Sequence, residues 1–127
     1  MIAIHYYEGA FGRTLRFEVQ DRNDTERLRE LFLGMSSNTD EVHENLCSEA
    51  DFSCFGLGQF TWRRALRSGA AKLLLEPSSV QWSLTQSQWE ECADLVEGLL
   101  TAGSGHQYLP VGESTDAVVL ISMNEQH

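Results

Sequence analysis

The segment His43-Glu44-Asn45-Leu46-Cys47 has the residue types and spacing closest to those of a metal site. A metalloprotease helix carries two histidines four positions apart, and here the second of these positions is Cys47. If the segment were helical, His43 and Cys47 would share one face, and Cys54 would supply a third zinc ligand. The spacing matches no class of zinc motif, and cysteine is common packing material, so we predict no metal ligands.

Motifs for catalysis and for cofactor binding are incomplete. Gly56-Leu57-Gly58 lacks the third glycine, and the helix expected after it, of a dinucleotide fingerprint. The chain has no nucleophile elbow and no phosphate-binding loop, and its carboxylates show no spacing that singles out a catalytic pair. We therefore predict no catalytic residues and no cofactor. Because catalytic groups can converge from distant positions, an enzyme stays an alternative to a binding protein.

A cluster of cations follows Trp62. Arg63, Arg64, Arg67 and Lys72 occur within twelve residues, 61–72, that contain no acid. Such a cluster can bind phosphate, but a net charge of −10 repels nucleic acid, and we predict no nucleic-acid partner. Two interpretations stay open. The arginines neutralise acids within the fold, or the Trp62, Arg63, Arg64 and Arg67 region binds an anionic metabolite as part of a small enzyme or ligand-binding domain.

Acidic residues dominate the rest of the chain. Up to Lys72 there are 9 basic and 11 acidic residues, and after it there are 8 acidic residues and no Lys or Arg. In the predicted second helix, four acids lie on or beside one face: Glu90, Glu91, Asp94 and Glu97. This face predicts a docking surface for a basic protein partner, because a field of one sign accelerates association. A solvated face that confers solubility is the simpler interpretation of the same pattern.

The first part of the chain predicts a hairpin followed by an amphipathic helix. Residues 2–7 and 13–20 have the composition and alternation of strands. A capping box at Asn23 predicts the start of a helix that ends near Gly34. The apolar residues of this helix have a spacing of i, i+3, i+4 and i+7, namely Leu28, Leu31, Phe32 and Met35. The polar segment 36–51 predicts no particular conformation.

The second part predicts further strands around one well-marked helix. The expected strands are 52–62 with a bulge or bend, 70–76, 79–84, 108–111 and 117–123. Thr85 and Gln88 form a capping box at the start of the helix, and Gly103 suits its left-handed end. This order indicates a single α+β domain over residues 1–127. We expect a mostly antiparallel β-sheet with two amphipathic helices packed on one face.

Neither a membrane span nor a secretory leader is expected. The longest apolar run, Ala117–Ile121, is far shorter than the roughly 20 residues that cross a bilayer. Residues 1–8 lack the charge and apolar length of a signal peptide. The three cysteines, Cys47, Cys54 and Cys92, form no paired pattern, which favours free thiols in the reducing cytoplasm. We therefore expect a cytoplasmic protein that does not bind membranes.

The C-terminal third resembles small acidic immunity proteins of bacterial toxin systems. The resemblance covers residues 80–123 and lies in Val80–Thr85, the helix that carries Trp89, and Gly105–Leu109. It implies a stoichiometric inhibitor that occludes the active site of a basic toxin. An escort of a basic protein is a variant of this hypothesis. A structural or dimerisation module, pairing through an exposed edge strand at 117–123, is a further alternative, and the oligomeric state stays undetermined.

Overall fold

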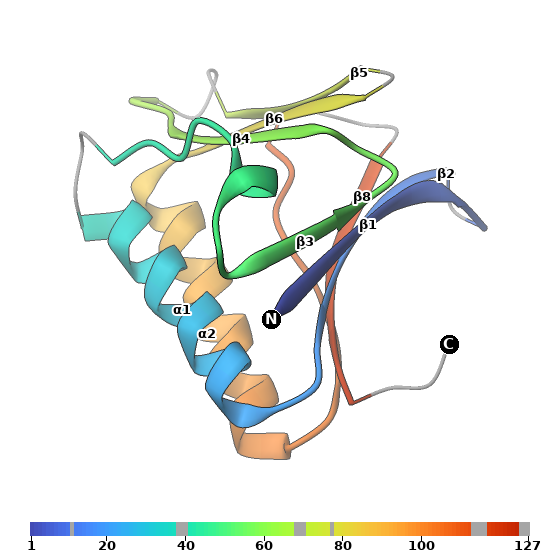
Figure 1. Ribbon diagram of the computed structural model, residues 1–127. Coiled ribbons are helices and arrows are strands. Elements are labelled where there is room, and N and C mark those ends of the chain that lie inside the picture. The colour runs from blue at the N-terminus through green and yellow to red at the C-terminus, as the bar shows by residue number, and fades with distance from the viewer. Residues whose placement is uncertain (11, 38–40, 68–70, 77, 113–116, 125–127) are drawn as a thin grey trace.

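The computed structural model describes residues 1–10, 12–37, 41–67, 71–76, 78–112 and 117–124 (Figure 1). The elements, in chain order, are β1 (Ile2–Gly9), β2 (Gly12–Val19), α1 (Arg22–Ser37), η1 (Leu46–Ser48), β3 (Phe52–Phe55), β4 (Gln59–Arg64), β5 (Lys72–Glu76), β6 (Ser79–Leu84), α2 (Gln86–Ala102), β7 (Gly105–Tyr108) and β8 (Ala117–Met123). Among these described elements, no helix has the length and apolar character to cross a membrane.

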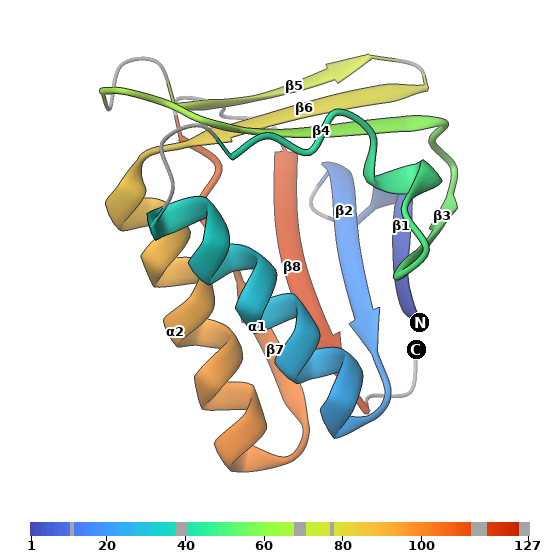
Figure 2. The same ribbon diagram turned by 60° about the vertical axis from the view of Figure 1, so that its left-hand side comes forward.

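The strands form two sheets. The five-stranded sheet has the order β3-β1-β2-β8-β7, and the three-stranded sheet has the order β4-β6-β5. Both helices lie side by side on one face of the five-stranded sheet, and the three-stranded sheet crosses above them (Figures 1 and 2). The α+β class and the two helices on one face are confirmed.

The pairing is more mixed than the hairpin pattern indicates. Of the six pairings between described strands, three are antiparallel and three are parallel. The antiparallel pairs join neighbours in the chain, β1 with β2, β5 with β6 and β7 with β8. The parallel pairs join strands separated by other elements, β1 with β3, β2 with β8 and β4 with β6. Alternation of apolar and polar residues predicts the antiparallel hairpins between neighbouring strands, but it does not predict the parallel pairing of strands that are distant in the chain.

Helix α1 differs from its prediction at both ends. Its first turn is capped by Asp21, whose carboxylate accepts a hydrogen bond of 2.7 Å from the backbone N–H of Asp24, so the prediction of Asn23 as the cap is wrong. The helix continues through Gly34 to Ser37. The predicted apolar stripe of Leu28, Leu31, Phe32 and Met35 is buried. The free energy of this burial offsets the low helix propensity of Gly34.

Helix α2 has the predicted ends. The hydroxyl of Thr85 accepts a hydrogen bond from the backbone N–H of Gln88, and the side chain of Gln88 accepts one from the backbone N–H of Thr85. Gly103 has a φ of 82° in the left-handed region and donates its N–H to Leu99. The buried stripe is Trp89, Cys92, Ala93, Val96, Leu99 and Leu100.

Other strands also differ from the predictions. Residues 52–62 are not one bulged strand, because β3 and β4 belong to different sheets. The chain turns between them at Gly56, where a Cβ atom would collide with the carbonyl oxygen of Tyr6. Strand β7 ends at Tyr108, where the prediction had it begin. Strand β8 is paired on both sides, so 117–123 is not an edge strand through which two copies could pair.

Trp62 lies at the junction of the two sheets and the two helices. Its ring is fully buried, with ring centroids at 5.1 Å from Phe32 of α1, 5.3 Å from Trp89 of α2, 5.8 Å from Trp82 of β6 and 6.0 Å from Phe17 of β2. These rings make offset and edge-to-face contacts, which stabilise beyond the area that they bury. Elements from every layer therefore meet at one side chain.

Candidate functional site

One face of the five-stranded sheet is covered by no described helix or strand (Figures 1 and 2). Five residues on this face form one row across all five strands, because each is the register partner of the next. Phe55 of β3 pairs with His5 of β1, and His5 pairs with Arg16 of β2. Arg16 pairs with Leu120 of β8, which pairs with Tyr108 of β7. We call this set the cross-strand row.

Aromatic rings on this face are open to solvent. Phe55 is 51% exposed at one end of the cross-strand row, Tyr108 is 54% exposed at the other end, and Tyr7 on β1 is 40% exposed. Phe55 stacks on His5 with a centroid distance of 4.9 Å, and the Arg16 guanidinium lies 5.7 Å from the centre of the Tyr7 ring. These contacts hold Phe55 and Tyr7 in position.

The charged side chains at the centre of this face have opposite signs and neutralise each other. The Arg16 guanidinium donates a hydrogen bond of 2.9 Å to the carboxylate of Glu18, and the same carboxylate lies 3.6 Å from Nε2 of His5. Glu18 therefore balances Arg16, and the face has little net charge of its own. A protein surface that combines exposed rings with a balanced ion pair is suited to contact with another protein.

A shallow hollow of about 220 Å³ lies in the same face. Its lining includes Tyr7, Arg16, Tyr108, Val118 and Leu120. Metabolite pockets usually enclose roughly 300–1,000 Å³, so this hollow is small for a metabolite.

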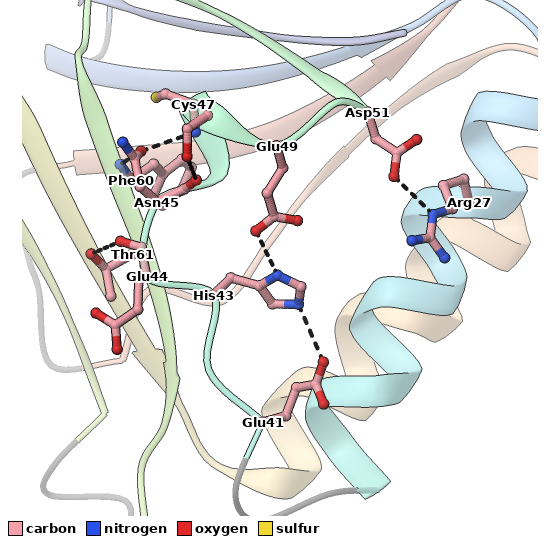
Figure 3. A network of polar contacts seen from close by, with 11 residues as sticks. Arg27, Glu41, His43, Glu44, Asn45, Cys47, Glu49, Asp51, Phe60 and Thr61 are labelled. Carbon is pink, nitrogen blue, oxygen red and sulfur yellow. Dashed lines mark hydrogen bonds and ion pairs between the residues drawn. The ribbon is translucent and has the colours of Figure 1, made fainter.

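The segment His43–Cys47 is not a helix. His43 forms an antiparallel bridge with Trp62 of β4 through both backbone groups, and only Leu46–Ser48 forms a short 3₁₀ turn. Figure 3 shows the His43 ring between the carboxylates of Glu49 and Glu41. Its Nδ1 lies 2.8 Å from a carboxylate oxygen of Glu49, and its Nε2 lies 3.5 Å from one of Glu41. The shared face that the zinc hypothesis requires does not exist, and no three potential ligands cluster in the described residues.

Asn45 attaches this segment to β4 (Figure 3). Its side-chain oxygen accepts hydrogen bonds from the backbone N–H groups of Cys47, at 3.0 Å, and Phe60, at 3.1 Å. The hydroxyl of Thr61 donates a further bond of 2.8 Å to the carbonyl of Glu44. This network is explained by its structural role, because each bond satisfies a backbone group of the irregular segment or of the strand beside it.

The three predicted arginines are brought together. Arg63, Arg64 and Arg67 line a hollow of about 520 Å³ with Ser83 and an exposed leucine. Arg64 donates to the carbonyl of Ser36 at 3.2 Å and to the side chain of Gln86 at 2.8 Å. Arg63 lies 3.5 Å from Glu44, whereas the described residues give Arg67 no ion pair. Trp62 is not part of this hollow, since its ring is fully buried in the core.

The predicted acidic face of α2 is exposed, and one of its residues is neutralised. Glu97 forms an ion pair of 2.7 Å with Arg29 of α1, which the sequence pattern of α2 alone does not reveal. Within the described part of the chain, Glu90, Glu91 and Asp94 form no ion pair. The acids of α1 differ, because each has a cationic partner: Asp24 with the N-terminus, Glu26 with Arg22, and Glu30 with Arg27.

Sequence reasoning did not identify the cross-strand row. Alternation in β1 and β2 shows that His5 and Arg16 point away from the buried side chains, but it does not show that they share a row with Phe55 and Tyr108. Comparison of the chain with models of protein families, with curated proteins and with solved structures found no match. The geometry of this chain is therefore the basis for inferring its function.

The substitution Asn45→Ala tests the structural role of the Asn45 network. We expect it to lower the free energy of unfolding by about 2 kcal/mol, because two backbone N–H groups lose their acceptor. Glu44→Gln is the matched control, because the side chain of Glu44 is 75% exposed. Urea unfolding measures both, and equal stability of the two variants would contradict this role.

Proposed function

We propose that the chain is a protein-binding protein that inhibits, or escorts, a basic partner by docking it on the open face of the five-stranded sheet. The observation that supports the proposal most is the exposure of Phe55, Tyr7 and Tyr108 on a face that no described element covers. A stoichiometric inhibitor is also what the resemblance to immunity proteins implies. Catalysis is not needed for this function, and no residue of the cross-strand row has to act as an acid or a base.

The cross-strand row has the composition of an interface centre. Aromatic and arginine side chains contribute most binding energy in protein interfaces, and here the rings flank Arg16. From Phe55 to Tyr108 the row crosses four strand spacings, about 19 Å in all, which is wide enough for the centre of a standard contact patch. Because Phe55 is stacked on His5, docking would cost little conformational entropy at this ring.

The charge of the molecule supports a basic partner. The net charge is −10, and the exposed carboxylates of Glu90, Glu91 and Asp94 form no ion pair among the described residues. Helix α2 lies on the opposite side of the five-stranded sheet from the open face (Figures 1 and 2). These acids therefore accelerate association with a basic protein through the electric field, and the rings on the open face determine how long the complex lasts.

The double substitution F55S/Y108S tests the contact face. A partner is first captured from a lysate of the source organism, identified by mass spectrometry and purified, and its binding kinetics are then measured. We expect a basic protein whose dissociation from the double variant is at least about tenfold faster, because two interface rings are lost. Leu33→Ser is the control, because Leu33 is also an exposed hydrophobic side chain but lies on α1 and not on the open face.

The triple substitution E90Q/E91Q/D94N distinguishes long-range electrostatic attraction of the partner from direct contact with it. We expect association at low salt to slow several-fold while dissociation stays unchanged, because the acids act at a distance. Faster dissociation from this variant, with unchanged dissociation from F55S/Y108S, would place the contact on α2 and contradict the open face as the docking site.

The arginine hollow supports a second candidate function, which is binding of an anionic metabolite. Its volume of about 520 Å³ lies in the range of metabolite pockets, and Arg63, Arg64 and Arg67 surround it. A phosphate group could accept hydrogen bonds from guanidinium groups that are already positioned, such as Arg64.

Thermal unfolding with inorganic pyrophosphate tests this second candidate. We expect the melting temperature to rise by a few degrees at millimolar pyrophosphate, because a ligand that binds only the folded state stabilises it. The R63Q/R67Q variant should lose the shift, and Arg22→Gln, on the far end of α1, should keep it. The absence of a shift in the unmodified protein would contradict an anion site.

A further inference from the structure

Two of the three cysteines lie against each other. Cys47 is in the η1 turn, and Cys54 is in β3, which pairs with β1 alone among the described strands. The η1 turn packs against β3, and both cysteine side chains are partly exposed while packing against the core. The two thiols are close enough for Cys47 to raise the pKa of the Cys54 thiol. Cys92 is fully buried in α2. The chain thus has one pair of neighbouring, accessible thiols and one shielded thiol.

We propose that Cys47 and Cys54 are a reversible oxidation site, at which a small disulfide such as oxidised glutathione converts the two thiols into an intrachain disulfide. The Cys47 thiolate attacks a sulfur of the oxidant, whose S–S bond breaks to release one small thiol and leave a mixed disulfide on Cys47. The Cys54 thiolate then attacks Cys47 Sγ and releases the second small thiol. The protein loses two hydrogens, and the oxidant is reduced to two thiols.

The surroundings of the pair determine which thiol reacts first. Burial raises the pKa of the Cys54 thiol, and the hydrogen bond and charge of Cys47 raise it further. Cys54 is therefore the less reactive thiol of the pair, and we assign Cys47 as the thiol that attacks the oxidant. Once Cys47 carries the mixed disulfide, the hydrogen bond and the charge are gone, so the pKa of Cys54 falls and the second step becomes easier.

The disulfide would join the η1 turn to a strand at the edge of the five-stranded sheet. Strand β3 has only four residues, and Phe55 follows Cys54 directly. A covalent link at Cys54 removes conformations from the unfolded chain and restrains the end of the strand that carries Phe55. The proposal does not depend on the function proposed above, because it requires only the two thiols and a small oxidant.

Peptide mass analysis of the full chain tests the proposal. No Lys or Arg lies between Arg29 and Arg63, so one tryptic peptide carries both cysteines, and Cys92 falls in another. After treatment with oxidised glutathione, denaturation and alkylation of free thiols, we expect residues 30–63 as a peptide that is two hydrogens lighter and unalkylated, with Cys92 alkylated. Glutathione adducts without the internal link, or two alkylated cysteines, would overturn the proposal.

Two serine variants test the order of the steps. Cys54→Ser leaves Cys47 without a resolving thiol, so we expect a stable glutathione adduct at Cys47. Cys47→Ser leaves Cys54 without its more reactive neighbour, so we expect an adduct at Cys54 that forms at least about tenfold more slowly. Equal rates at the two positions would overturn the assignment of Cys47 as the attacking thiol, and the mass of the unmodified chain tests the link even if one variant folds poorly.

Discussion

The packing around the Trp62 ring is the constraint on which the other features of the structure depend. One indole contacts rings from β2, α1, β6 and α2, so both sheets and both helices share a single contact centre. Two neighbouring indoles also attach other segments to this centre, because Trp82 donates to the carbonyl of Pro110 after β7 and Trp89 donates to the carbonyl of Arg63 in β4. Packing at crystalline density leaves little freedom for the elements to shift independently.

This centre also determines which surfaces are free to act. The helices and the three-stranded sheet pack on the side of the five-stranded sheet where Phe17 lies, and the alternate residues of the same strands face outward. His5 and Arg16 therefore belong to the open face, together with the exposed rings of Phe55 and Tyr108. The burial of Trp62 has a second consequence. Because its ring is in the core, the hollow that the neighbouring arginines line contains no aromatic side chain among the described residues.

Features that depend on residues close together in the chain could be predicted from the sequence. Features that depend on contacts between distant parts of the chain could not. The α2 capping box and the buried alternation around Phe17 were predictable, because hydrogen bonds and periodicity within a few residues determine them. The division of 52–62 between two sheets depends on parallel pairing with β1 and β6, which no local pattern encodes. The Arg29–Glu97 ion pair and the cross-strand row were missed for the same reason, because each is formed by elements far apart in the chain.

Native-state hydrogen exchange at rising urea concentration tests most directly whether Trp62 holds the two sheets together as one unit. If it does, we expect the backbone amides of Trp62 and Val80 in the three-stranded sheet to exchange with the same opening free energy, and the same urea dependence, as those of Phe17 and Val119 in the five-stranded sheet. Exchange in the three-stranded sheet through a smaller opening, with the five-stranded sheet still protected, would show that the sheets unfold separately and would contradict the central role of Trp62.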